Sequence, residues 1–462
     1  MVRVAVIGGG ASGSIVAYEL ANCGVKVIII EKSDRLGGKA AYFGCKADAE
    51  PGWLTLKQPT GLPDGVSVGV LAGLFDSASV SAGLPDSASA VAPTGLPNSV
   101  PAGLTAGVSA GLQTVPSTAA LKCNNCGLCL IGGLWEKVKK NPNIDILYNS
   151  FPIDITGGVG DYTIVVKTSN AASSVHMDGE CSDVTREKNG GCNDVTGNSS
   201  GGCNGVTGNS NGGCNGVTGN SSGELSGVVR RIGGISSIVV ATGFETSSLN
   251  GGHIQISGRE GLFSGLELEE VLKSRSKDML FEEAPSSVAF ILCVGSRDVK
   301  ENAMYCSRVC CGYSTRAAKV IRGYYPGCAI TFFYMELQAV MKGDYFKQLR
   351  ASNIEFVKSR PLNIKGGRPV FITYENSDGE VVERGFDKVI LADGIHPIKD
   401  NDRLADIFQL GQDTNGFLKV IGAAEEKRVF VAGCAKRPMK IEETYYDART
   451  VASRILSFIG GG

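Results

Sequence analysis

The N-terminal segment carries the feature that most restricts how this chain can fold. An apolar run of strand length at 2–8 (VRVAVIG) leads into the glycine-rich loop GGGASG at 8–13, and a helical pattern follows at 12–23. A G-x-G-x-x-G loop between a strand and a helix is the dinucleotide-binding fingerprint of a Rossmann unit. The sequence therefore predicts a nucleotide-binding α/β unit that starts at the first strand.

Each glycine of the loop has a separate predicted role. Gly8 permits the tight turn, Gly10 lets the backbone approach a pyrophosphate, and Gly13 allows the helix to pack closely on the strand. The free N–H groups at the helix N-terminus favour the phosphate charge. Glu31 ends the next apolar run and can accept hydrogen bonds from both ribose hydroxyls. The Glu31 carboxylate would repel a 2′-phosphate, so NADP is disfavoured at this site. For the glycine loop itself, a plain tight turn without a ligand is the alternative interpretation.

The rest of the chain alternates between strand and helix patterns. Further strands are expected at 25–31, 236–242, 288–295, 329–335, 388–394 and 428–433, and further helices at 265–274, 307–322 and 441–457. This alternation is typical of a doubly wound α/β protein.

Two low-complexity stretches interrupt the pattern. Between about 60 and 117 the chain repeats Gly-Leu-Pro-Asp/Asn, and from 179 to about 228 it repeats an eleven-residue unit such as GGCNGVTGNSS. Each eleven-residue unit offers one Val and one Cys, which is too little to bury a core. We interpret both stretches as surface insertions, and an array of metal-binding or redox thiols is the alternative for the second.

Composition excludes several classes of function. The net charge of −1 gives no sign of binding to nucleic acid, and no apolar run reaches the roughly 18 residues of a membrane span. With no secretory leader pattern, the fifteen cysteines indicate reduced thiols or metal ligands rather than disulfides. Only three histidines occur, which disfavours histidine-based zinc or acid/base chemistry. We expect a soluble, cytoplasmic protein.

Three further motifs resemble flavoproteins of the disulfide-reductase class. Gly37-Gly38 follows Glu31 at the distance seen in that class, Ala241-Thr242-Gly243 ends a strand as its ATG motif does, and Ala432-Gly433 resembles the strand end beside the ribityl chain. The resemblance implies FAD rather than NAD. The candidate cofactor-binding residues are Gly8, Gly10, Ala11, Ser12, Gly13, Glu31, Lys32, Gly38, Thr242, Gly243, Gly433 and Thr444.

The second half holds a concentrated set of cysteines, CVGSRD at 293–298 followed by YCSRVCC at 305–311. They occupy the position where the same class of flavoprotein keeps a second, NAD(P)-binding Rossmann unit, but the glycines for a pyrophosphate are absent. Four thiolates at a strand end and a helix start suit an iron–sulfur cluster. A redox-active disulfide and buried structural cysteines are the alternatives.

The string CVGSRD…YCSRVCC resembles the A-type flavoprotein subunits of heterodisulfide reductase. Supporting matches outside the inserts are Cys126-x-x-Cys129 followed by Asn141-Pro142-Asn143-Ile144, Arg360-Pro361, and Ala432-Gly433-Cys434 followed by 441–444. The resemblance implies a thioredoxin-reductase-like fold, one FAD, and one 4Fe–4S cluster on Cys293, Cys306, Cys310 and Cys311. It also implies an electron-distributing role beside disulfide-reducing and iron–sulfur subunits and a ferredoxin or hydrogenase-type donor.

The chain departs from that family in several places. It starts at the Rossmann strand and ends at Gly462, without the family's added iron–sulfur modules, so we expect no electron exit for bifurcation. Arg316, the candidate catalytic residue, stands where the family has a Lys, which keeps the charge but changes the donor geometry. The triplet Ala392-Asp393-Gly394 replaces a second ATG, and Glu442 replaces a Pro.

The remaining cysteines have open assignments. Cys123, Cys126 and Cys129 have ferredoxin-like spacing, and Cys45 could complete a set; a second cluster, redox thiols and incidental cysteines all remain open. Cys434 is assigned to the flavin-facing strand end, and Cys23 and Cys328 are interpreted as structural cysteines.

The sequence thus predicts a double Rossmann architecture with two insertions. We expect an FAD-binding segment at 1–45, a first insertion at 46–119, a Cys-containing FAD segment at 120–170 and a repeat insertion at 171–224. A further FAD segment at 225–280, a Rossmann-like iron–sulfur domain at 281–385 and a C-terminal FAD segment at 386–462 follow. The expected function is electron transfer through FAD and 4Fe–4S toward disulfide reduction. A stand-alone NAD(P)H-dependent disulfide oxidoreductase and a non-catalytic flavin-binding scaffold are the alternatives.

Overall fold

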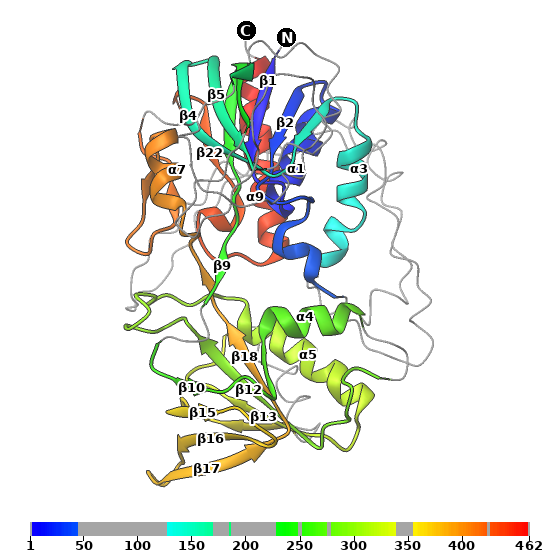
Figure 1. Cartoon of the computed structure of the whole chain (residues 1–462), viewed down its shortest axis with the longest axis vertical. Coiled ribbons are helices and arrows are strands. Elements are labelled where there is room, and N and C mark those ends of the chain that lie inside the picture. Colours follow the sequence, from blue (N-terminus) through cyan, green and yellow to red (C-terminus); the bar gives the residue numbers. More distant parts are fainter. Residues whose placement is uncertain are drawn as a thin grey trace, which may run out of the picture.

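The computed structural model describes residues 2–44, 127–169, 184–185, 228–247, 252–274, 279–338, 354–422 and 426–460. Two five-stranded parallel sheets form the cores of two units, which lie one above the other in Figure 1. The chain passes between the units at β9 (Glu245–Thr246) and β19 (Ile395–His396), which pair antiparallel. Because both sheets are parallel with helices packed on them, the α/β double Rossmann prediction is confirmed.

The first sheet has the strand order β22–β8–β1–β2–β3. Its strands are β1 (Arg3–Ile7), β2 (Lys26–Ile30), β3 (Ile144–Leu147), β8 (Ser237–Val240) and β22 (Val429–Val431). Pairing of Ile7 with both Ile30 and Val240 aligns the carboxyl ends of the three central strands at one edge. The glycine loop leaves the sheet at this edge, where ligands of open α/β sheets bind.

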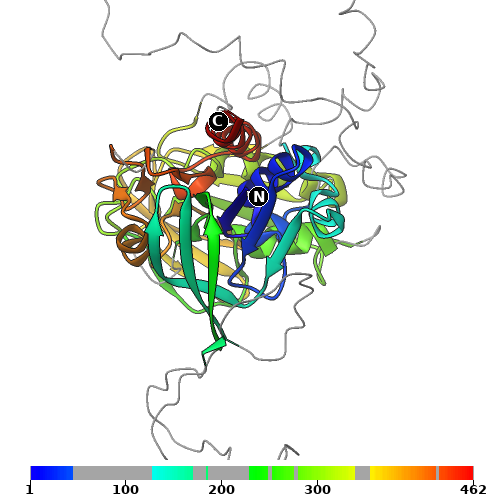
Figure 2. The same cartoon turned by 90° about the horizontal axis from the view of Figure 1, so that it is seen from above.

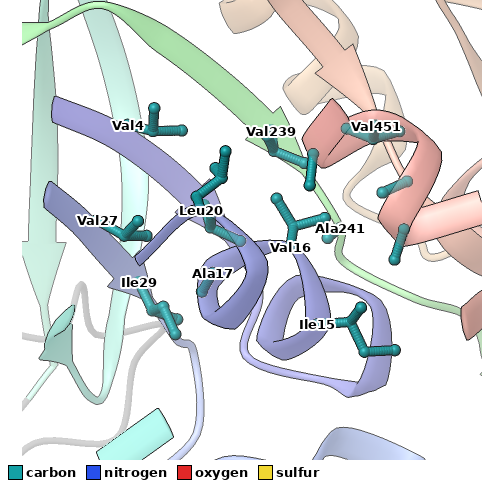
Figure 3. Packing of buried hydrophobic residues seen from close by; sticks show 14 of the residues in the cluster. Val4, Ile15, Val16, Ala17, Leu20, Val27, Ile29, Val239, Ala241 and Val451 are labelled. Atoms are coloured by element: carbon teal, nitrogen blue, oxygen red, sulfur yellow. The ribbon is translucent and has the colours of Figure 1, made fainter. Parts of the chain in front are cut away.

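Three helices cover one face of the first sheet: α1 (Ala11–Asn22), α3 (Leu134–Lys140) and α9 (Ile441–Gly460). Figure 3 shows Val16 and Leu20 of α1 directed toward the side chains of the sheet, with Val16 beside Ala241 and with Val451 of α9 farther along the same cluster. Val16 and Leu20 are fully buried, and burial of such a side chain contributes about 1.5–3 kcal/mol. This packing fixes the N-terminus of α1 at the end of β1.

The opposite face of the first sheet is covered by antiparallel strands and a short helix, so the doubly wound expectation is wrong for this face. The strands are β4 (Ser150–Gly158), β5 (Asp161–Thr168), β7 (Val228–Ile235) and the short β6 (Val184–Thr185), and the helix is α7 (Asn401–Phe408). Figure 2 shows β4, β5 and β7 on the opposite side of the sheet from α9. Tyr162 and Ile164 of β5 and Ile235 of β7 are buried against the first parallel sheet and cover its apolar side chains.

The second sheet has the order β11–β18–β12–β13–β14. Its strands are β11 (Leu262–Ser264), β12 (Ser287–Val294), β13 (Ala329–Phe333), β14 (Ile354–Val357) and β18 (Lys388–Asp393). Helices α4 (Gly265–Ser274) and α5 (Cys310–Tyr324) cover the face that holds Phe290 and Phe332. In Figure 1 both helices lie on the side toward the first unit.

A mixed four-stranded sheet covers the other face of the second parallel sheet. Its strands are β10 (Gln255–Ser257), β15 (Asn363–Lys365), β16 (Val370–Glu375) and β17 (Val381–Phe386). β11 and β18 belong to the second unit, whereas we expected 225–280 and 386–462 to belong to the FAD domain. The second unit therefore extends beyond 281–385 in both directions.

Most of the expected elements occur close to their predicted bounds. The helix expected at 307–322 is the exception, because α5 begins only at Cys310. The Gly-Leu-Pro-Asp/Asn stretch and almost all of the eleven-residue array lie outside the described residues. In the part of the chain that the structure describes, no helix is both long and apolar enough to cross a membrane.

Candidate functional site

A cavity of about 750 Å³ lies where the two units meet. The first unit contributes the glycine loop, the ends of β2 and β8, and the start of α9; the second contributes α4, α5 and the end of β18. Among the predicted cofactor-binding residues, ten line this cavity: Gly8, Gly10, Ala11, Ser12, Glu31, Lys32, Gly38, Thr242, Gly243 and Thr444. Gly13 and Gly433 are outside the lining.

The three motif glycines have different steric surroundings. Gly8 has a φ of +102°, and a Cβ there would lie 2.6 Å from the Ala241 carbonyl oxygen. A Cβ on Gly13 would lie 1.9 Å from the Gly8 carbonyl oxygen, so this glycine brings α1 against β1. A Cβ on Gly10 would meet no atom within 4 Å and would project into the cavity. Gly8 and Gly13 therefore serve the fold, while Gly10 leaves room for a ligand.

The N-terminus of α1 is available to an anion. Among the described residues, no side chain caps this helix. Its first turn contains no acidic residue, and Ala11 and Ser12 line the cavity. Free N–H groups and the positive end of the helix dipole favour a phosphate here.

Glu31 is buried at the end of β2 and lies in the cavity wall. Its Oε2 accepts a hydrogen bond from the Gly9 N–H at 2.6 Å, and its Oε1 accepts one from the Ser33 N–H at 2.8 Å. These bonds fix the carboxylate while leaving lone pairs for ribose hydroxyls. Beside it, Lys32 pairs with Asp400 at 2.8 Å, so its ammonium is shared with another chain segment.

Residues of the later motifs converge on the same loop. The buried Thr242 Oγ1 has no hydrogen-bond partner among the described residues, and Gly243 has a φ of +78°. Gly433 (φ +66°) packs so tightly that a Cβ there would lie 2.6 Å from the Ser12 Oγ. The open space at Gly10, the uncapped helix and the unpartnered Thr242 hydroxyl together fit the ADP half of FAD.

The four predicted cluster cysteines lie in the second unit beside the cavity. Cys293 is the penultimate residue of β12 and has a φ of +61°, an uncommon conformation for a residue other than glycine. Cys310 and Cys311 open α5 and are buried. Cys306 is half-buried and lies in the loop before α5, so the expectation that three cysteines open the helix is wrong for this one.

The four thiols influence one another electrostatically. Hydrogen bonding to the Cys310 thiol lowers the pKa of Cys293, and the same interaction raises the pKa of Cys310 to about 12. Hydrogen bonding to Cys310 and burial raise the pKa of Cys311. The charge of Cys306 acts on both Cys293 and Cys310. Cys293 is therefore the thiol of the set whose pKa is lowered toward ionisation.

Backbone N–H groups also point at these sulfurs. Arg308 N–H donates to Cys306 Sγ at 3.3 Å, and the backbone of Gln338 donates to Cys311. Within the described ranges, no group of three or more His, Cys, Asp or Glu side chains is arranged to hold a metal ion. Thiolates are the donor type of iron–sulfur clusters, and these thiols lie close enough to act on one another electrostatically.

Arg308 lies outside α5, contrary to expectation. It precedes the helix with a φ of +63°, and its guanidinium pairs with Glu443 of α9 at 2.7 Å. This ion pair joins the cysteine loop to the first unit.

Helix α5 connects the cysteines with the cavity. Val309, Gly312, Tyr313 and Arg316 follow the spacing of one helical face and line the cavity, whereas Cys310 and Cys311 belong to the apolar core of the second unit. Arg316 Nε is buried and has no partner among the described residues. The candidate catalytic arginine therefore faces the cavity from the helix that carries two of the cysteines.

The loop between Cys293 and Cys306 is held by Asp298, whose side chain is 1% exposed. Asp298 Oδ2 accepts hydrogen bonds from the His253 N–H at 3.0 Å and from Arg360 at 2.5 Å, and Oδ1 accepts one from the Lys300 N–H at 2.9 Å. Burial raises the pKa of Asp298, but hydrogen bonds from His253 and the charge of Arg360 outweigh it, so the pKa lies below its ordinary value of 3.8. Asp298, the last residue of the CVGSRD motif, is thus hydrogen-bonded to Arg360 of the Arg360-Pro361 motif. We call this contact the Asp298 anchor.

Sequence reasoning missed part of the cavity wall. Glu269, Tyr313 and Asp393 line the cavity from the second unit, and each is largely buried. The one available signal was Asp393, which stands out as a carboxylate inside a degenerate ATG motif.

The remaining cysteines lie partly inside and partly outside the described ranges. Cys45, Cys123 and Cys126 fall outside them, and Cys129 is exposed. Cys434 is buried and lines the cavity, with its Sγ directed to the Met439 carbonyl oxygen at 3.6 Å. Cys23 is exposed, whereas Cys328 is buried in the core of the second unit.

Comparisons with known proteins find similarity to redox proteins. The family described as "NAD(P)-binding Rossmann-like domain" matches residues 6–57. The A-type subunit of the H(2):CoB-CoM heterodisulfide,ferredoxin reductase of Methanothermobacter thermautotrophicus is 31% identical over 245 residues, which is 48% of this chain and 36% of that protein. A second A-type iron-sulfur subunit, from the CoB–CoM heterodisulfide reductase of Methanopyrus kandleri, is 25% identical over 100% of this chain and 65% of its own length. The chain thus spans less than two thirds of these relatives.

Similar solved structures include two thioredoxin reductases. The Lactococcus lactis enzyme has a TM-score of 0.46 and 13% identity, covering 100% of both chains. The T. acidophilum enzyme has a TM-score of 0.47 and 13% identity, covering 99% of this chain and 98% of its own. The sequence matches confirm the resemblance seen in the cysteine motif: the chain is similar in sequence to the A-type subunits of the heterodisulfide reductases.

Proposed function

We propose that this chain is an FAD-dependent, iron–sulfur electron-transfer subunit of a heterodisulfide-reductase-like complex. The names of its relatives mention a heterodisulfide, ferredoxin and H(2), which supports a disulfide as the substrate class. The proposed partners are disulfide-reducing and iron–sulfur subunits, with a ferredoxin or hydrogenase-type donor. The observation that carries the proposal is the position of α5. One face of this helix lines the nucleotide cavity, and its first turn holds Cys310 and Cys311.

Each group of residues has a distinct task in this proposal. The uncapped α1 N-terminus and Gly10 bind the pyrophosphate, and Glu31 fixes the ribose. Arg316 places a positive charge in the cavity wall from the second unit. When bound, FAD supplies two-electron chemistry and the cluster supplies one-electron chemistry, and both depend on their protein surroundings.

The cysteines would ligate a 4Fe–4S cluster as thiolates. Cys293 is the penultimate residue of β12, and Cys306 lies in the loop before α5. Cys310 and Cys311 stand at the N-terminus of α5, whose dipole favours negative charge. The Asp298 anchor holds the loop between Cys293 and Cys306 in place.

The test is to replace Cys310 by Ser and to measure iron, acid-labile sulfide and flavin in anaerobically purified protein. We expect iron and sulfide to fall sharply while FAD stays bound, because the FAD-binding motifs lie in the first unit. Flavin reduction by artificial donors should survive, and transfer to a one-electron acceptor should fail.

Cys328→Ser is the matched control, since Cys328 is also buried in the second unit but lies outside the proposed set. This variant should keep its iron. If Cys310→Ser retains full iron and sulfide, or if the wild-type protein contains none, the cluster assignment is refuted.

A further inference from the structure

Asp393 is a buried carboxyl group whose contacts are incomplete. It ends β18 and is 5% exposed. Its Oδ2 accepts a hydrogen bond from the Gly265 N–H at 3.0 Å, whereas the buried Oδ1 has no partner among the described residues. The residue lines the cavity between the two units. A buried polar atom without a partner costs roughly 1–3 kcal/mol, so the unpartnered oxygen of a residue that lines a cavity calls for an explanation, and a ligand contact supplies one.

Capping of α4 does not account for Asp393. Ser264 and Glu267 already form a reciprocal capping box, with Ser264 N–H donating to Glu267 at 2.7 Å and Glu267 N–H donating to Ser264 Oγ at 3.1 Å. Asp393 is therefore an additional acceptor at this helix N-terminus: its Oδ2 accepts a hydrogen bond from the Gly265 N–H, and the Leu266 N–H also acts on its carboxylate, while Oδ1 has no hydrogen-bond partner among the described residues.

The location of Asp393 relative to the glycine loop identifies which part of a ligand it would meet. Gly10 and Glu31 mark the ADP end of the cavity. Arg316, Tyr313 and Asp393 line it from the second unit, where a bound FAD extending away from its ADP half would place the isoalloxazine ring.

We propose that Asp393 contacts the redox end of the bound flavin and, as a neutral carboxylic acid, donates a hydrogen bond from Oδ1 to an acceptor atom of the ring. No covalent bond forms or breaks in this contact. The inference rests on the proposed FAD site and adds a hydrogen-bonding residue, supplied by the second unit, to it.

The electrostatic surroundings of Asp393 agree with a neutral acid. Burial raises its pKa to about 7, although the backbone N–H groups of Gly265 and Leu266 oppose the rise. Glu267 on α4 also raises the pKa, and Arg259 lowers it. Arg259 and Glu267 pair at 2.7 Å, which reduces both effects.

Other groups pack around this site from α4 and α5. Tyr313 has a pKa well above its ordinary value because of burial and the nearby Asp393, so it stays neutral. Glu269 lines the same cavity from α4, and the Arg316 side chain lines it from α5. Asp393 would therefore change its protonation state near neutral pH, and a bound flavin would sense the change.

The experiment measures the visible absorption spectrum of FAD bound to the full chain from about pH 5 to pH 9. We expect the wild-type spectrum to change in a single transition near the pKa of Asp393. In Asp393→Asn, the amide oxygen can keep the Gly265 bond while the NH₂ group remains a permanent donor, so the transition should disappear. Asp393→Thr, which restores an ATG triplet, provides a second variant that also lacks the titration.

Glu267→Gln is the matched control, because Glu267 is the neighbouring acid but lies outside the cavity lining. The pH-dependent transition in the FAD absorption spectrum should persist in this variant. If the wild type binds FAD without a spectral transition, or if the transition survives in the Asp393 variants, the assignment of Asp393 is overturned while the FAD site stands. If the wild type binds no FAD, the proposed function fails, and this inference fails with it.

Discussion

Replacement of Gly10 by Val separates the ligand-binding role of the glycine loop from its structural role. Gly10 precedes α1 with φ −70° and ψ −167°, an extended conformation that any residue adopts. A Cβ there meets no atom within 4 Å. We therefore expect the free energy of unfolding of the apoprotein to change by about 1 kcal/mol or less, the range for an unfavourable residue at an N-cap.

The effect of Gly10→Val on FAD binding should be much larger. The valine side chain would occupy the space through which a pyrophosphate approaches the N–H groups of α1. Loss of two hydrogen bonds to a charged group, at about 1.5–3 kcal/mol each, weakens binding by about 3–6 kcal/mol. This corresponds to a Kd at least about 100-fold higher.

Gly13→Val is the matched comparison, because the same side chain enters the same loop. Its Cβ would lie 1.9 Å from the Gly8 carbonyl oxygen, so α1 would have to move. Overpacking of this kind costs about 1–3 kcal/mol or more. Flavin content after purification, FAD titration by fluorescence quenching, and urea unfolding of the apoproteins would measure both effects. Stoichiometric FAD in Gly10→Val with wild-type affinity would refute the assignment of the loop.

Two further predictions concern stability. Replacing residues 179–223, which lie outside the described residues apart from β6, by a short Gly/Ser linker should leave flavin content and Tm nearly unchanged, since the repeat units cannot bury a core; a collapse of folding would show that the array is structural. Asp298→Asn should lower the free energy of unfolding by about 3–5 kcal/mol in urea titrations at pH 7, because Arg360 loses a buried partner. The lowered pKa of Asp298 makes its contribution fully present above pH 3.8 and lost as the pH falls through the folded-state pKa, so an equal loss at pH 2 would contradict this account.

The local sequence determined the elements that depend on short-range pattern. The apolar runs at 2–8 and 25–31 became β1 and β2, and the glycine loop between β1 and α1 has the predicted form. The reason is that strand and helix periodicity and the steric freedom of Gly8 act within a few residues. The cysteine string also pointed to the sequence similarity with the A-type subunits of heterodisulfide reductases, because rare residues at fixed spacing carry information without reference to the fold.

Only the tertiary structure decided what covers each sheet and what completes the cavity. The sequence pattern did not identify β4, β5 and β7. Which face of an antiparallel strand is buried depends on the sheet that it packs against, and that contact is not visible in the sequence. The late start of α5 removes Arg308 from the helix, and Arg308 instead pairs with Glu443, 135 residues away. Asp393 illustrates the same limit: its residue type was visible in the sequence, but burial and the unpartnered Oδ1 arise only where β18 ends beside α4 and the cavity. Such contacts are set by packing between segments that are far apart in the sequence, which local pattern does not encode.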